Sequence, residues 1–96
     1  MGLRIYHPTS IVLTNAIIGE NFTIFQNCTV GQKYGGKQGY GMIPHIGNNV
    51  SMYAGSSIIG NVTVADNVVI GAHSCLVKDA LEAGVYIGLP AKKLYK

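Results

Sequence analysis

The sequence has little charge for its length, because only 11% of its 96 residues are charged. An ordinary soluble domain has about 25%. It also lacks tryptophan, and no stretch approaches the roughly 18 uninterrupted apolar residues of a membrane-spanning helix. A chain that is 48% hydrophobic is neither a disordered tail nor a solvated coiled coil. These absences indicate one small packed domain that does not bind a membrane and that partner subunits help to bury.

Cysteine is also scarce: Cys28 and Cys75 are the only two, and they lack C-x-x-C spacing. The N-terminus lacks the apolar core and cleavage site of a signal peptide, so we expect reduced, buried thiols and a cytoplasmic protein. The net charge of +3 is modest, and lysines concentrate in residues 33–37 and 92–96. This distribution favours a small anionic ligand over nucleic acid, which binds a broad basic stripe.

Large apolar residues recur every six positions, and this period is the strongest signal in the sequence. The recurring residues are Tyr6, Val12, Ile18, Ile24 and Val30, followed after a break in phase by Ile46, Met52, Ile58, Val64, Ile70 and Leu76. A small or β-branched residue stands four places after most of them. Three places after many of them stands an asparagine, at Asn15, Asn21, Asn27, Asn49, Asn61 and Asn67, with Gly55 in the same slot.

A six-residue period fits short strands joined by corners and does not fit a helix, whose period is about 3.6 residues. Side chains alternate along a strand, so the small residue and the next large one face the same side. Asparagine and glycine tolerate the positive φ of a sharp corner. Such strands bury their inner face only by coiling and stacking. The sequence therefore predicts an all-β, single-stranded parallel β-helix of under four coils, with residues 1–96 as one domain.

Two segments fall outside the period. Residues 31–45, GQKYGGKQGYGMIPH, hold five glycines and break the phase, so we expect a glycine-rich loop extruded from one coil. Loops on a rigid scaffold often carry function. Residues 81–96, LEAGVYIGLPAKKLYK, predict a short C-terminal strand, a proline and a basic tail.

Other motifs are weak. The stretch GQKYGGK at 31–37 resembles the start of a phosphate-binding P-loop, but Gln38 stands where Ser or Thr would bind magnesium. The histidines His7, His45 and His73 are too far apart in sequence to form a close ligand pair, so we expect no metal site. A metal-dependent hydratase is therefore the weakest alternative function.

The hexads resemble the [LIV]-G-x-x-[STAV]-x repeat of the hexapeptide-repeat acyltransferases, most of all serine acetyltransferases and related polysaccharide O-acetyltransferases. The resemblance lies in YHPTSIVL at 6–13, IGENFTIFQNCTVG at 18–31, IGNNV at 46–50 and IGLPAKKL at 87–94. It implies a left-handed β-helix, whereas ordinary crossovers turn the other way. It also implies a homotrimer, whose interface we expect to include Ile11 and Ile17 as outward apolar side chains.

The resemblance implies an acetyl-CoA-dependent O-acetyltransferase in which a histidine acts as general base on the acceptor hydroxyl. His7 matches the family's histidine, and His45 is an alternative base. Serine acetyltransferases end the loop in Arg-His-Pro, whereas this chain has Met42-Ile43-Pro44, which leaves the acceptor open between L-serine and a sugar. No acidic residue precedes His7 to orient it. A non-catalytic or truncated β-helix scaffold is therefore the alternative function.

The resemblance also assigns the groove for the coenzyme. In the family this groove holds the pantetheine arm and the nucleotide between subunits, and it maps onto Ala54, Ala72, Lys78, Pro90, Ala91 and Lys92. Small residues let an extended ligand lie against the backbone, and lysines meet phosphates as point charges. Lys92 and Lys93 are the candidates for the coenzyme phosphates. The alternative for these two lysines is a solvated tail that binds nothing.

Overall fold

The computed structural model describes residues 3–5, 11–13, 16–31 and 43–94. In these residues it has short strands and no helix, and so no helix able to cross a membrane. The strands are β1 (Leu3–Ile5), β2 (Val12–Leu13), β3 (Ile17–Ile18), β4 (Phe22–Ile24), β5 (Thr29–Gly31), β6 (His45–Ile46), β7 (Ser51–Met52), β8 (Ser57–Ile59), β9 (Thr63–Val64), β10 (Val68–Ile70), β11 (Cys75–Leu76), β12 (Gly84–Gly88) and β13 (Ala91–Lys93).

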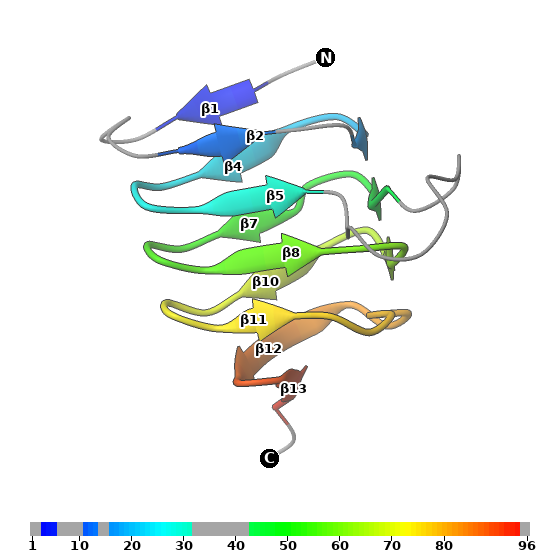
Figure 1. Cartoon of the computed structure of the whole chain (residues 1–96). Helices are drawn as coiled ribbons and strands as arrows, with labels where there is room; N and C mark the ends of the chain where they lie inside the picture. Colours follow the sequence, from blue (N-terminus) through cyan, green and yellow to red (C-terminus); the bar gives the residue numbers. More distant parts are fainter. Residues whose placement is uncertain (1–2, 6–10, 14–15, 32–42, 95–96) are drawn as a thin grey trace, which may run out of the picture.

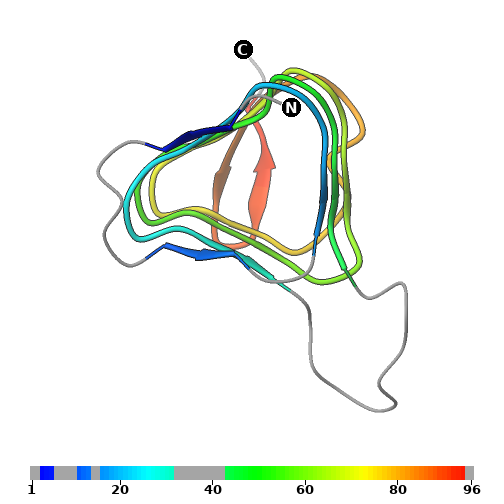
Figure 2. The same cartoon turned by 90° about the horizontal axis from the view of Figure 1, so that it is seen from above.

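The strands form three sheets that stand as the walls of a triangular prism (Figures 1 and 2). Wall 1 has the order β1-β4-β7-β10-β12-β13, wall 2 the order β11-β8-β5-β2, and wall 3 the order β3-β6-β9. Neighbouring strands pair in parallel, except that β12 and β13 are antiparallel. Seen from its N-terminal end in Figure 2, the chain turns counter-clockwise as it recedes, which is the left-handed sense. The predicted all-β, left-handed parallel β-helix is confirmed.

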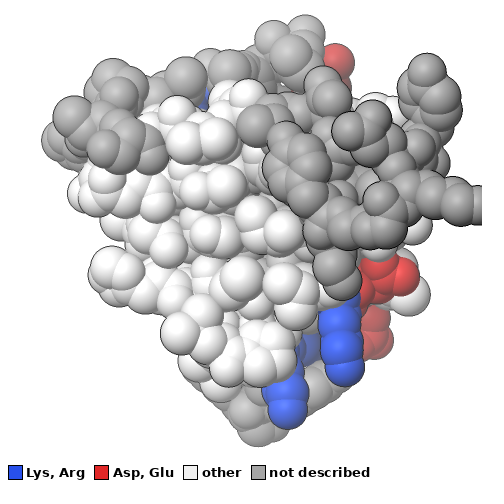
Figure 3. Space-filling view, in the orientation of Figure 1, with Lys and Arg blue, Asp and Glu red and all other residues white. Residues whose placement is uncertain are grey.

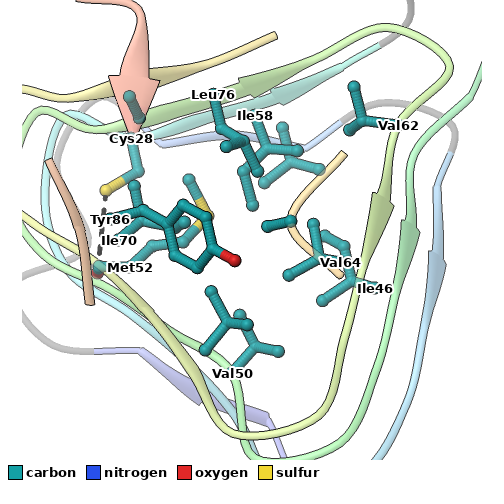
Figure 4. Packing of buried hydrophobic residues seen from close by; sticks show 14 of the residues in the cluster. Cys28, Ile46, Val50, Met52, Ile58, Val62, Val64, Ile70, Leu76 and Tyr86 are labelled. Carbon is teal, nitrogen blue, oxygen red and sulfur yellow. Dashed lines mark hydrogen bonds between the residues drawn. The ribbon is translucent and has the colours of Figure 1, made fainter. Parts of the chain in front are cut away.

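The six-residue period places apolar side chains inside the prism. In β4, the buried side chains of Phe22 and Ile24 flank the partly exposed Thr23, and β10 repeats this alternation. Figure 4 shows the side chains converging from the three walls. Removing each large apolar side chain from water contributes about 1.5–3 kcal/mol. The buried members at the predicted inward positions are Ile24, Val30, Ile46, Met52, Ile58, Val64, Ile70 and Leu76.

The first coil departs from the predicted phase by one residue. The β1–β4 pairing sets Ile5 opposite Ile24, and the β2–β5 pairing sets Leu13 opposite Val30. The sequence prediction had put Val12 at the inward position, and this is wrong: Val12 is 48% exposed. The inward positions Ile5, Leu13 and Ile18 are eight and five residues apart instead of six and six, and their strands still pair with the next coil. The period alone therefore does not determine the phase of this coil.

This shift also changes the residues expected at a subunit interface. Ile11, predicted to point outward, is partly buried and packs against the core. Ile17 is 55% exposed, as expected of an outward side chain. The other first-coil residue predicted inward, Tyr6, lies outside the described residues, as does Asn15 of the corner slot.

Asparagine and glycine form most of the corners, as predicted. Residues with positive φ in the predicted slot are Asn21 (56°), Asn27 (59°), Asn49 (58°), Gly55 (73°) and Asn67 (61°). Asn61 was predicted for the same role, but the residue before it, Gly60, has the positive φ of 95° instead. His73 also occupies the slot, with φ of 59°. The slot therefore selects residues that tolerate a left-handed backbone, and a histidine is among them.

The glycine-rich segment lengthens one coil. Residues that pair between neighbouring coils are separated by the length of one coil. This length is 18 residues between Ser51 and Val69, but 28 residues between Thr23 and Ser51, in the coil that contains the glycine-rich segment. Gly31 is the last residue of β5, and His45 is the first of β6. Both ends of the predicted 31–45 loop therefore belong to strands, and residues 32–42 lie outside the described part.

A hairpin closes the C-terminal end of the prism. β12 and β13 cross the interior of the triangle in Figure 2, and β12 continues wall 1 by pairing with β10. Tyr86 of β12 is buried inside the prism (Figure 4), and its hydroxyl donates a hydrogen bond to the carbonyl of Glu82 at 2.9 Å. Lys92 and Lys93, predicted in a tail, belong to β13.

Candidate functional site

The turns that join wall 1 to wall 2 stack along one edge of the prism, which we call corner 1–2. They are residues 25–28, 53–56 and 71–74, and they lie above one another on the left of Figure 1. The Gly55 N–H donates to the Gln26 carbonyl at 3.0 Å, and the His73 N–H donates to the Ala54 carbonyl at 2.9 Å. Because each turn is hydrogen-bonded to the next, corner 1–2 is one continuous edge.

The outer surface of corner 1–2 combines small residues with an aromatic pair. Ala54 is partly exposed, and Ala72 is exposed. The rings of Phe25 and Tyr53 stack beside them, with centroids 4.9 Å apart and an interplanar angle of 23°. Small side chains allow a ligand to approach the backbone, and aromatic faces offer apolar contact area. The corner is thus suited to an extended, partly apolar ligand.

Buried hydroxyls fix the inner side of the same corner. Ser56 donates a hydrogen bond from Oγ to the carbonyl of Tyr53 at 2.7 Å. Ser74, one coil on, accepts a hydrogen bond at its Oγ from the Gly88 N–H at 2.9 Å. Buried polar groups with such partners hold the backbone in one arrangement. The second bond also ties the β12–β13 hairpin to corner 1–2.

Positive charge lies mainly at the C-terminal end of the described molecule. Lys78 follows β11, and Lys92 and Lys93 belong to β13; the remaining described cation is Arg4 of β1. In Figure 3 blue side chains lie at the lower end with red ones beside them, while the white part of the face above carries almost no colour. The carboxylates of Asp79 and Glu82 lie at the same end, so its excess of positive charge is small and attracts an anionic group only weakly.

Comparison with known proteins identifies relatives of the chain, although no family model matches it. The chain is 33% identical over 96 residues to the serine acetyltransferase of Synechococcus elongatus, covering 99% of this chain and 38% of that protein. The crystal structure of Neisseria gonorrhoeae serine acetyltransferase matches with a TM-score of 0.90 and 35% identity, over 99% of this chain and 37% of that one. The chain is related to serine acetyltransferases.

A second solved structure is bound to a ligand. Serine acetyltransferase from Brucella abortus, in complex with coenzyme A, matches with a TM-score of 0.84 and 30% identity, over 94% of this chain and 36% of that one. The chain thus spans less than half the length of the relatives it matches. These similarities confirm the resemblance to hexapeptide-repeat acetyltransferases, and above all to serine acetyltransferases, that the repeat predicted.

The structure brings some of the predicted coenzyme residues together. Ala54 and Ala72 lie one coil apart on corner 1–2, and the hairpin reaches the same corner through Gly88 and Ser74. Pro90 is exposed near the tip of that hairpin. Ala91, also predicted to line the groove, is buried and belongs to the core.

The predicted lysines are spread over several places. Lys92 is exposed on β13, whereas the Lys93 ammonium lies 3.5 Å from a Glu82 carboxylate oxygen. The Lys93 chain also packs over Gly84, where an added methyl group would lie 2.8 Å from its Cε. Lys78 lies past the other end of β11, where wall 2 joins wall 3, and so is not on corner 1–2.

The predicted general base, His7, lies outside the described residues, and its role stays a prediction. His45, the alternative base, is exposed on β6 of wall 3. The described residues contain no group of three or more His, Cys, Asp and Glu placed to hold a metal ion. Cys28 is buried, as predicted, but Cys75 is partly exposed because it faces outward from β11; both are free thiols.

Sequence reasoning missed three residues of corner 1–2. Phe25 and Tyr53 stand far apart in the chain, and only the length of the extruded segment determines that they stack. His73 carried a visible signal, since it stands three places after Ile70, in the slot that asparagine or glycine fills in most other hexads.

Proposed function

We propose that the chain is a serine acetyltransferase-like O-acetyltransferase that uses acetyl-CoA. The observation that carries the proposal is the match to serine acetyltransferase over 99% of the chain with a TM-score of 0.90. Solved serine acetyltransferases include complexes with coenzyme A and with serine. Corner 1–2 supports it with small side chains beside exposed backbone, which suit an extended arm, and with Lys92 on the adjoining hairpin.

The proposed reaction is a direct transfer with His7 as general base. The His7 imidazole takes the proton of the acceptor hydroxyl while the hydroxyl oxygen attacks the thioester carbonyl carbon. The carbon–sulfur bond then breaks, and the imidazolium returns the proton to the coenzyme sulfur. L-serine is the proposed acceptor, and a sugar hydroxyl is the alternative that the same chemistry serves.

The proposed assembly is a homotrimer with the coenzyme between subunits. One chain carries the predicted coenzyme residues on two different edges, since Ala54 and Ala72 lie on corner 1–2 and Lys78 lies past the far end of β11. Corner 1–2 of one copy, placed beside the Lys78 edge of the next, reunites them. The exposed Ile17 and the uncharged surface in Figure 3 favour contact between copies.

The test is a coenzyme-release assay on the purified chain with acetyl-CoA and either L-serine or a hexose. We expect acceptor-dependent release of free coenzyme with serine. His7→Ala is expected to lower kcat at least about 100-fold, because positioned proton transfer contributes about that much or more. His45→Ala is the matched variant, and light scattering checks that both variants keep the assembly of the parent chain.

Each other outcome changes a specific part of the proposal. Loss of activity in His45→Ala, with His7→Ala fully active, moves the base to β6. Release with the hexose alone changes the acceptor class. A chain that shows no heat on titration with millimolar coenzyme A is a non-catalytic scaffold, and the proposed function is then wrong.

A further inference from the structure

His73 is chemically unlike the other corner-slot residues that have positive φ. The other slot positions with positive φ hold asparagine or glycine, which supply the left-handed backbone without an ionisable group. Histidine tolerates this conformation too, but neither the fold nor the core requires an imidazole on the surface. The side chain is exposed, so burial does not account for it either.

The imidazole is held against the corner by its neighbour one coil before. A methyl group added to Gly55 would lie 2.6 Å from Nδ1 of His73 and 2.9 Å from its Cε1. The ring therefore lies directly over the Gly55 backbone, in space that only glycine leaves open. No described residue forms a hydrogen bond with the imidazole. The ring N–H of His73 is therefore held in place without a hydrogen-bond acceptor among the described residues.

The surroundings of His73 are those of the proposed coenzyme site. It stands between the exposed Ala72 and the buried Ser74, and Ser74 holds the hairpin whose strand β13 carries the exposed Lys92. A ligand that follows corner 1–2 toward the hairpin passes the imidazole before it reaches the lysine. Coenzyme A carries its negative charge on phosphates, and an imidazole N–H donates readily to a phosphate oxygen.

We propose that His73 is a further coenzyme-binding residue, whose ring N–H donates a hydrogen bond to a phosphate of the coenzyme. This inference rests on the proposed function. It implies a direction for the bound ligand, with phosphates toward the hairpin and the thioester toward the N-terminal end of the prism. His73 acts in binding and takes no part in the acyl transfer.

The test compares two acyl donors in the full chain. His73→Asn keeps a residue that four other corners hold at positive φ, so we expect it to fold normally. We expect kcat/KM for acetyl-CoA to fall about three- to tenfold, through KM, as for the loss of one exposed hydrogen bond to a charged group. S-acetylpantetheine has no phosphate, and its kcat/KM is expected to stay unchanged.

A matched variant, Asn67→His, places an imidazole in the same slot at a different corner and is expected to leave both donors unchanged. Equal kcat/KM for acetyl-CoA in His73→Asn and the parent chain overturns the inference. So does an equal loss for both donors, because the contact would then not involve a phosphate. If the parent chain turns over neither donor and binds no coenzyme A, the proposed function itself fails.

Discussion

The middle coils and the first coil carry the same kind of residue pattern but bury it to different extents. Ile58 in a middle coil is fully buried, whereas Leu13 of the first coil points to the same interior and is 39% exposed. A middle coil has a coil on either side, while the first coil has a described neighbour on one side only. The hexad determines which way a side chain points, and the neighbouring coils determine whether water reaches it.

The two ends of the prism differ in the same way. At the C-terminal end the hairpin crosses the interior, and Tyr86 is only 6% exposed inside it. At the other end, Leu13, which points to the same interior, remains 39% exposed. Closing an end therefore takes a separate element, because a further hexad would only expose a new set of inward side chains.

The largest expected effect tests burial in a middle coil against the first. Ile58→Ala is expected to lower the free energy of unfolding by about 3 kcal/mol, because it leaves a cavity among packed neighbours. Leu13→Ala, at a solvated position, is expected to lower it by about 1 kcal/mol. Urea unfolding followed by circular dichroism, at one fixed protein concentration, measures both. Equal losses would contradict the difference between the coils.

A smaller effect tests the corners. Asn49 has positive φ, whereas Asn61 does not, although both stand in the same slot of the repeat. Asn49→Ala is expected to lower the free energy of unfolding by about 1 kcal/mol, because alanine tolerates the left-handed backbone poorly. Asn49→Gly, which keeps that conformation available, is the control, and Asn61→Ala is expected to have almost no effect. A large loss in Asn61→Ala would show that its side chain is needed for another reason.

The smallest effect concerns the closed end. Tyr86→Phe removes the hydrogen bond to the Glu82 carbonyl and keeps the buried ring. We expect a loss of about 0.5–1 kcal/mol in the free energy of unfolding, since Glu82 is exposed and water can replace the hydroxyl. A loss as large as that of Ile58→Ala would mean that the hydroxyl, rather than the ring, stabilises the hairpin.

Most of the fold was predictable because the hexad is a local rule that repeats. Ile24, Met52 and Ile70 face inward for the same reason, and each repetition supports the same interpretation of the pattern. The prediction failed at Val12, where an adjusted spacing of eight and then five residues replaces two sixes, and at Asn61, where the preceding Gly60 has the positive φ instead. Such an adjustment leaves the composition and the period intact, so the sequence does not reveal it.

The candidate site was less predictable, because it is made of residues that only stacking brings together. The resemblance pointed to Ala54 and Ala72, and they do share an edge. It also pointed to Ala91, which is buried, and to Lys93, which lies beside Glu82. Burial and ion pairing depend on what lies opposite each side chain in space, and a motif in the sequence does not state that.

By itself the sequence determined the walls: short strands, inward aliphatic side chains, corners of asparagine and glycine, and a body almost free of charge. These follow from the alternation of side chains along a strand and from the backbone freedom of two residue types, which act over a few neighbouring positions. The tertiary structure decided the phase of the first coil, the hairpin that closes the prism, and the meeting of Phe25 with Tyr53 and of His73 with Gly55. These features depend on the number of residues in each coil, because that number determines which side chains become neighbours when the coils stack.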